Sequence, residues 1–225
     1  MPFNLSKPIL YLITRGATTE GTTPDAPEFA RILNQISAAV AVGINLIQIR
    51  EKQLTARVLF DLVERAGELT RGTDTRLLVN DRADVAAGAG ADGVHLTMQS
   101  LDAATIRRTF GEEVLIGAST HSLEEARSAR EQGADFIVFG PVFETESKKF
   151  FGPPAGLEKL SEVARELCGF PVLALGGISA TNAAGCFAAG AQGVAGISLF
   201  NQAEVLTKVK TAIVAAAKTQ NDRRP

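Results

Sequence analysis

The chain has 225 residues, of which 45% are hydrophobic and 21% charged, and its formal net charge is −2. This length fits one α/β domain with a full-sized core. The charge argues against nucleic acid as a partner, because a nucleic-acid groove needs an excess of Lys and Arg. No run of about 18 apolar residues occurs, and the start lacks a secretory leader, so we expect no membrane partner and a soluble, cytoplasmic protein.

The two cysteines, Cys168 and Cys186, show neither a metal-ligand spacing nor a disulfide framework. Both lie in apolar or Ala-rich surroundings, which is typical of cysteines that pack in a core. We therefore expect both thiols to be buried and to take no part in chemistry.

A repeated unit organises the chain. In four segments a Gly follows a helix-like stretch and precedes a short apolar run rich in Val and Ile, a pattern that predicts a helix end and a buried strand. These segments are 41–50, 88–96, 131–140 and 188–198. Four further strands are predicted at 9–14, 76–80, 114–119 and 171–177.

Helical patterns fill the intervals between the strands. Their approximate limits are 27–42, 55–71, 83–89, 101–110, 122–132, 156–168, 180–189 and 201–217. The fifth is the clearest, with Ser122 as a candidate N-cap, acidic residues in the first turn and Gly133 at the end.

Eight alternating strands and helices predict a closed parallel (β/α)8 TIM barrel. An open doubly wound sheet is the alternative, but eight similar units without a nucleotide fingerprint favour the barrel. We expect one domain over residues 1–225, with 218–225 as a frayed tail.

Function in such barrels lies on the loops that follow the strands, and two anion sites are predicted there. The first follows strands seven and eight, where backbone N–H groups could cradle a phosphate. Its residues are Gly176, Gly177, Gly196 and Ser198.

The second predicted site is cationic and combines Arg50, Lys52 and Lys148 with Asp81. Gln48 and Arg50 alternate along one strand, so both should point into the barrel mouth. A solvated charge cluster is the simpler alternative for residues 50–52. A carboxylate among cations would form a salt bridge, unless Mg²⁺ lies between it and a pyrophosphate.

Three further polar residues have simpler structural explanations. His95 and His121 follow strands, and each is more simply a strand-end imidazole bonded to backbone than a general base. Asp84 opens the third helix, where it could serve as a cap.

With these residues assembled, the chain resembles the thiamine phosphate synthase family over about residues 9–200. Seven motifs carry the resemblance, in order and at matching strand ends. They are "IQIREK" (47–52), "VNDRAD" (79–84), "GADGVHL" (90–96), "IGASTHSLEEA" (116–126), "GADFIVFGPVFETESKK" (133–149), "LALGGI" (173–178) and "GVAGIS" (193–198).

The resemblance implies that the protein joins aminopyrimidine-methyl pyrophosphate to a thiazole phosphate and releases pyrophosphate. It implies that Asp81 binds Mg²⁺ and that Ser119, Lys148 and Arg50 serve the reacting centre. The residues implied to hold the pyrimidine pyrophosphate are Gln48, Arg50, Glu51, Lys52, Asn80, Ser119 and Lys148. Those implied to hold the thiazole phosphate are Thr145, Ser147, Gly177, Ile197 and Ser198.

The chain departs from the family at the metal site. Family members follow His-Leu with Gly-Gln-x-Asp, whereas this chain reads "HLTMQSL", which places Thr97 at the Gly and Ser100 at the second metal carboxylate. Asp102 lies two residues further on, a turn away in the next helix. The metal site is thereby left with one carboxylate of the usual pair.

Two other functions remain as alternatives. A sister family, the thiazole tautomerase, shares the barrel and lacks the metal carboxylates, but Pro141 stands where its proton-shifting His would be. A catalytically silent barrel that binds phosphorylated thiazole or pyrimidine is the third hypothesis. The sequence leaves the oligomeric state open, a homo-oligomer included.

Overall fold

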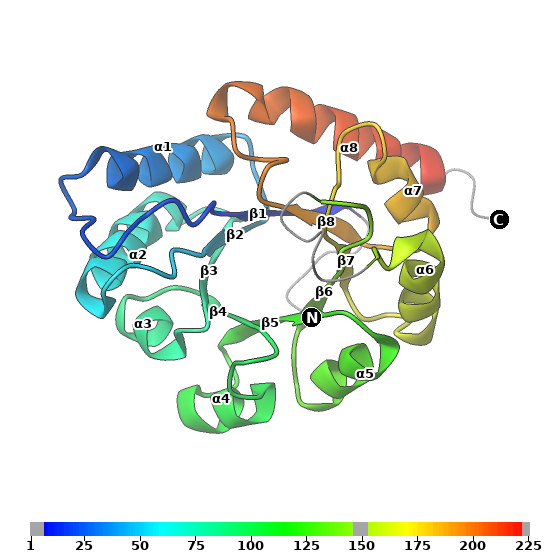
Figure 1. Cartoon of the computed structure of the whole chain (residues 1–225), viewed down its shortest axis with the longest axis horizontal. Helices are drawn as coiled ribbons and strands as arrows, with labels where there is room; N and C mark the ends of the chain where they lie inside the picture. The colour runs from blue at the N-terminus through cyan, green and yellow to red at the C-terminus, as the bar shows by residue number, and fades with distance from the viewer. Residues whose placement is uncertain (1–6, 146–152, 222–225) are drawn as a thin grey trace.

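A computed structural model describes residues 7–145 and 153–221. Within them, eight parallel strands pair in chain order and close into a barrel, the last strand pairing with the first (Figure 1). The strands are β1 (Ile9–Ile13), β2 (Leu46–Ile49), β3 (Arg76–Asn80), β4 (Gly93–Leu96), β5 (Leu115–Thr120), β6 (Phe136–Phe139), β7 (Val172–Ala174) and β8 (Gly193–Gly196). The predicted TIM barrel is confirmed.

The helices form an outer ring around the barrel, as Figure 1 shows. They are α1 (Pro27–Ala41), α2 (Ala56–Thr70), α3 (Ala83–Gly88), α4 (Ala103–Phe110), α5 (Leu123–Glu131), α6 (Gly156–Glu166), α7 (Ala183–Ala188) and α8 (Leu206–Asn221). A 3₁₀ turn, Ala203–Val205, precedes α8. Each lies where the sequence pattern predicted a helix.

Local sequence explains where these elements begin and end. Ser122 accepts a hydrogen bond from the Glu125 N–H and caps α5 as predicted, and Gly133 after it has φ +93°. Strand β7 is shorter than the predicted 171–177. The pair Gly176 and Gly177 has φ +99° and +63°, a left-handed conformation that cannot continue a strand.

Two apolar layers hold the fold together. Along β1, Ile9, Tyr11 and Ile13 pack inside the barrel, whereas Leu10 and Leu12 pack outward beneath the helices. The alternation follows from the two-residue period of a strand, and it is why the short strands are apolar on both faces. The filled interior leaves polar chemistry to the loops at the barrel mouth.

Two expectations need correction. Cys186 is buried, as expected, and burial raises the pKa of its thiol to about 11, but Cys168 is exposed because it follows the end of α6.

Helix α8 continues to Asn221, so the first part of the expected frayed tail is helical, and 222–225 lie outside the described residues. In the described chain, no helix is long and apolar enough to span a membrane.

Candidate active site

A connected set of polar side chains lies across the ends of β2, β3 and β4. Gln48, which is 2% exposed, donates through Nε2 to Asn80 Oδ1 at 3.0 Å. Asn80 in turn donates through Nδ2 to Asp81 Oδ2 at 2.7 Å. The parallel register explains the contact, since Gln48 pairs with Leu78 and is therefore level with the end of β3.

Asp81 is the centre of this set. Its Oδ1 accepts hydrogen bonds from the hydroxyls of Thr97, at 3.2 Å, and of Ser100. Its backbone has φ +60°, a left-handed conformation that Asp tolerates better than most residues. Ser100 therefore faces Asp81, as the alignment of "HLTMQSL" predicted. We call Gln48, Asn80, Asp81, Thr97 and Ser100 the Asp81 network.

A second buried chain of polar groups runs through the barrel to β5. The Tyr11 hydroxyl lies 3.2 Å from His95 Nδ1, and His95 Nε2 lies 2.9 Å from Ser119 Oγ. Burial lowers the pKa of His95 to about 4, a shift that the nearby Asp81 charge opposes, so this imidazole is neutral at pH 7. His95 thus bonds to side chains, and the expectation that it merely bonds to backbone is wrong.

The sequence reasoning missed Tyr11, although a signal was available. It is the single tyrosine of the chain and lies in an otherwise aliphatic strand. A fully buried phenol needs a hydrogen-bond partner, and burial raises the pKa of Tyr11 well above its ordinary value. A lone Tyr within an apolar strand therefore indicates a buried polar contact.

The charged side chains that follow β2 differ in exposure, and one of them bonds to the loop after β1. Lys52 is exposed and Arg50 half-buried, as a site for a charged ligand requires. Glu51, in contrast, is 3% exposed and accepts hydrogen bonds from Gly16 N, Thr18 N and Thr18 Oγ1. Its carboxylate is directed to the loop after β1, which argues against the expected direct contact with substrate.

The loops after β6, β7 and β8 carry polar groups of a different kind. Thr145 Oγ1 is buried and has no hydrogen-bond partner among the described residues. Within the same residues, the backbone N–H groups of Gly177 and Ser198 have no protein acceptor. Ile197 is half-buried against the apolar interior of the barrel. We call Thr145, Gly177, Ile197 and Ser198 the phosphate side.

Packing gives a reason for glycine at 177 besides the predicted approach of a phosphate to the backbone, which stays a prediction. A Cβ there would lie 2.5 Å from the Glu144 carbonyl oxygen and 2.8 Å from Phe143 Cβ, too close for any side chain. Glycine is needed so that the loop after β6 can pack on the end of β7. Ser147 and Lys148 follow that loop and lie outside the described residues.

The remaining predicted polar residues have structural contacts. His121 Nδ1 contacts the Gly140 carbonyl, so the expected backbone bond is confirmed for this His. Asp84 lies in the first turn of α3 and pairs with Arg82 at 2.6 Å, and hydrogen bonds from Arg82 and from first-turn backbone N–H groups lower the pKa of its carboxyl. Asp102 is the N-cap of α4, and its carboxylate accepts from the Thr105 N–H at 2.6 Å.

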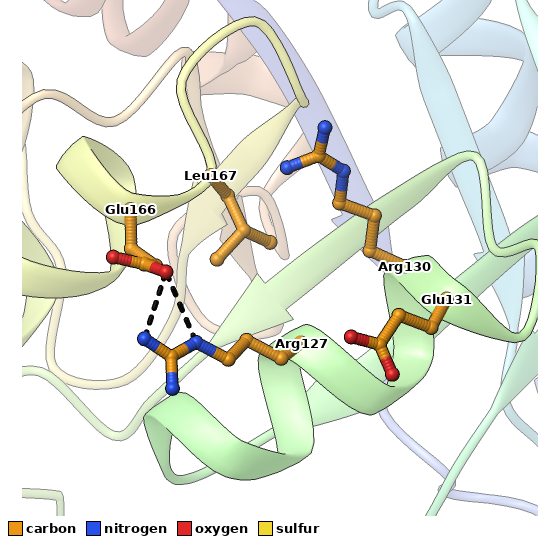
Figure 2. A pocket seen from close by; sticks show the side chains of 5 residues that line it. All are labelled: Arg127, Arg130, Glu131, Glu166 and Leu167. Carbon is orange, nitrogen blue, oxygen red and sulfur yellow. Dashed lines mark hydrogen bonds and ion pairs between the residues drawn. The ribbon is translucent and has the colours of Figure 1, made fainter.

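Two hollows lie outside the barrel interior. One, of about 180 Å³, is formed by Arg127, Arg130, Glu131, Glu166 and Leu167 between α5 and α6, and Figure 2 shows Arg127 paired there with Glu166. It contains no residue predicted for the site. The other, of about 440 Å³, has the loop before α4 on one side and α5 on the other. It borders the site at Ser100 and Ser119.

Comparison of the chain with known proteins shows the family to which it belongs. A family model described as thiamine monophosphate synthase (TMP-TENI) matches residues 10–200. The chain is 39% identical to the thiamine-phosphate synthase of Roseiflexus sp. (strain RS-1), over 99% of this chain and 92% of that protein. It is 42% identical to the thiamine-phosphate synthase of Moorella thermoacetica, over 74% of this chain and 79% of that protein.

A solved structure agrees with the sequence relatives. The thiamine phosphate pyrophosphorylase from Pyrococcus furiosus superposes on the chain with a TM-score of 0.76 and 30% identity, covering 96% of this chain and 98% of that one. The chain belongs to the thiamine monophosphate synthase family.

Proposed function

We propose that the protein joins aminopyrimidine-methyl pyrophosphate to thiazole phosphate, with release of pyrophosphate. One observation carries the assignment within the family: two separate polar sites open on the same barrel mouth. The Asp81 network and Arg50 lie after β2 to β4, and the phosphate side lies after β6 to β8. A reaction that joins two anionic substrates needs two such sites side by side.

The pyrimidine pyrophosphate binds, in this proposal, at the network side, meaning the Asp81 network together with Arg50 and Lys52. Gln48 and Asn80 contact the pyrimidine and orient one another through their hydrogen bond. Arg50 and Lys52 contact the pyrophosphate, the former through its planar guanidinium and the latter as a point charge. Lys148, beyond the described residues, neutralises charge on the leaving group.

The buried chain behind Ser119 sets the direction of its hydroxyl. A neutral imidazole carries one N–H, and the Tyr11 hydroxyl has no described acceptor other than His95 Nδ1. If Tyr11 donates to Nδ1, then His95 Nε2–H donates to Ser119 Oγ. The Ser119 O–H is then free to donate to a pyrophosphate oxygen as negative charge grows there.

Mg²⁺ fits this site as an ion completed by substrate. The oxygen atoms of Asp81, Thr97 and Ser100 suit a hard cation, and Mg²⁺ is commonly held by one or two carboxylates together with substrate phosphates. Among the described residues, no group of three His, Cys, Asp or Glu side chains could hold a metal by itself. When bound, Mg²⁺ would offset the charge of the departing pyrophosphate.

The thiazole phosphate binds at the phosphate side. Among the described residues, the Thr145 hydroxyl and the N–H groups of Gly177 and Ser198 are donors without a protein acceptor, as donors to a phosphate would be. Ser147 adds a donor and Ile197 an apolar contact. Cleavage of the carbon–oxygen bond leaves a pyrimidinylmethyl cation, and the thiazole nitrogen attacks it with its lone pair. No protein nucleophile is needed.

The proposed partners are these two phosphorylated small molecules, and the proposed location is the cytoplasm. Neither nucleic acid nor a membrane has a part in the reaction. A homo-oligomer stays a prediction.

The test measures pyrophosphate release from the two substrates, together and singly, with and without Mg²⁺. Release that requires both substrates supports the synthase. Isomerisation of the thiazole phosphate alone would identify a tautomerase, and tight binding without turnover would identify a silent barrel. Mass spectrometry of the joined product completes the assignment.

A further inference from the structure

Glu51 is a buried carboxylate whose partners are all on the loop after β1, residues 14–26. Its Oε1 accepts from Gly16 N at 3.0 Å, and its Oε2 accepts from Thr18 N at 3.2 Å and from Thr18 Oγ1 at 2.8 Å. Thr18 is itself only 4% exposed. Among the described residues, no Lys or Arg pairs with Glu51, so hydrogen bonds alone compensate its charge.

The loop held by Glu51 lies directly against Arg50. The Arg50 N–H donates to Thr14 Oγ1 at 2.8 Å, which ties the ends of β1 and β2 together. A Cβ built on Gly16 would lie 3.3 Å from the Arg50 carbonyl oxygen and 3.4 Å from its Nη1. The backbone at Gly16 therefore forms one wall of the space in which the guanidinium lies.

We propose that Glu51 is a positioning residue that clamps the loop at Gly16 and Thr18 and so holds Arg50 in place for pyrophosphate. The inference rests on the proposed function in one respect only, that Arg50 binds the pyrophosphate group. Glu51 acts through the loop and does not touch the substrate. A long, flexible Arg side chain loses much of its rotamer freedom in such a confined site before the ligand arrives, which favours binding.

The same loop offers a matched control. Thr22, 3% exposed, donates through Oγ1 to Glu28 Oε1 at 2.9 Å, which is also a hydroxyl–carboxylate bond of a buried Thr. Glu28 belongs to α1, and within the described residues no hydrogen bond or ion pair of Thr22 or Glu28 reaches Arg50. Thr22 Oγ1 also accepts from the Thr19 N–H at 3.0 Å, so Thr22→Val removes two hydrogen bonds of the same loop. It leaves the hydrogen bonds of Glu51 to Gly16 and Thr18 in place.

The experiment compares Thr18→Val, Thr18→Ser and Thr22→Val by calorimetric titration with inorganic pyrophosphate in the presence of Mg²⁺. Thr18→Val should weaken pyrophosphate binding about tenfold, whereas Thr18→Ser and Thr22→Val should stay within about twofold of wild type. In turnover, Thr18→Val should raise KM for the pyrimidine pyrophosphate by a similar factor and leave KM for the thiazole phosphate unchanged. Melting temperatures verify that each variant is folded.

Glu51→Gln provides a second route to the same contact. Its amide NH₂ would face the N–H and O–H donors of the loop, so the loss should exceed that of Thr18→Val, at roughly thirtyfold. The double variant Thr18→Val/Glu51→Gln should bind pyrophosphate no more weakly than Glu51→Gln alone, because both substitutions break the same clamp.

The outcomes separate this inference from the proposed function. If the wild type binds pyrophosphate with the expected variant pattern but does not join the two substrates, the proposed function is wrong and the clamp stands. If the folded Thr18→Val and Glu51→Gln bind pyrophosphate like wild type, the clamp is wrong even when the enzyme is active. Equal losses in Thr18→Val and Thr22→Val also overturn it, because the effect would then be general loosening of the loop.

Discussion

The two sides of the barrel mouth differ in how their polar groups are satisfied. In the Asp81 network, each side chain already bonds to another, from Gln48 through Asn80 to Asp81 and on to Ser100. On the phosphate side, the Thr145 hydroxyl and the amides of Gly177 and Ser198 have no acceptor among the described residues. The groups of one side bond to one another before a ligand arrives, whereas the other side has donors without an acceptor in the described part of the chain.

The difference fits the roles proposed for the two sides. A prearranged network holds charged groups where charge would develop, which would suit a leaving group and a bound Mg²⁺. Unsatisfied donors gain a hydrogen bond on binding, which serves the capture of a substrate that does not fragment. Substitutions on the network side should therefore affect turnover and stability, whereas those on the phosphate side should affect the affinity of one substrate.

The largest expected effect is that of Asp81→Asn. Asn tolerates the left-handed backbone at this position, so the fold should persist. Its side-chain NH₂, however, would face hydrogen-bond donors in place of a carboxylate oxygen, and a bound Mg²⁺ would lose its carboxylate ligand. Turnover should fall roughly a hundredfold or more. Steady-state kinetics and a thiazole phosphate titration check this. Substantial loss of thiazole phosphate binding would show that the two sides are not separate.

His95 should make the stability of the network side depend on pH. Its pKa is lowered from 6.5 to about 4 in the folded protein, so below pH 6.5 the unfolded chain binds the proton first. The free energy of unfolding should be highest above that pH and should lose about 3 kcal/mol as the pH falls through 4.

Urea unfolding of wild type and His95→Gln between pH 4 and 7.5 measures this contribution. The free energy of unfolding of the His95 variant should decline less steeply toward low pH. Identical slopes in the two proteins would remove His95 as the cause.

Ser100→Asp tests whether the network side is short of one metal ligand. A second carboxylate would face Asp81, so the free protein should be less stable through like-charge repulsion, and Mg²⁺ should restore its stability. Mg²⁺ should bind about tenfold more tightly in the presence of pyrophosphate. Calorimetry and melting curves with and without Mg²⁺ check both effects, with Ser100→Asn as the neutral control. An unchanged Mg²⁺ dependence would make position 100 irrelevant to the metal.

Thr145→Val should give the smallest effect and the clearest contrast between the sides. It removes a buried hydroxyl that has no described partner, so the free energy of unfolding should stay the same or rise. Affinity for the thiazole phosphate should fall roughly five- to tenfold, because one hydrogen bond to the ligand is lost. Thr97→Val, which breaks a bond to Asp81, should instead lower stability. Lower stability in Thr145→Val than in Thr97→Val would contradict the difference drawn between the two sides.

The sequence by itself determined the barrel and the strand ends that carry polar residues. Gly at the helix ends and short Val- and Ile-rich runs predict alternating helices and strands, because these depend on local backbone preference and on period. The same pattern assigned Gln48, Asn80, Asp81 and Ser100 to neighbouring strand ends. Their approach follows from the parallel order of strands and needs no knowledge of side-chain rotamers.

Only the tertiary structure decided which of these groups bond to one another. Tyr11 meets His95 across 84 positions in the chain, because barrel closure lets side chains of β1 and β4 meet in the interior. Glu51 meets Thr18 across 33 positions, because β1 and β2 are paired and the residues after them lie side by side. The partners of Glu51 and the packing reason for Gly177 depend on how loops fold back on the strand ends. Hydrophobic period predicts elements, but a buried polar contact is decided by angstrom-scale geometry between distant segments, which no local pattern contains.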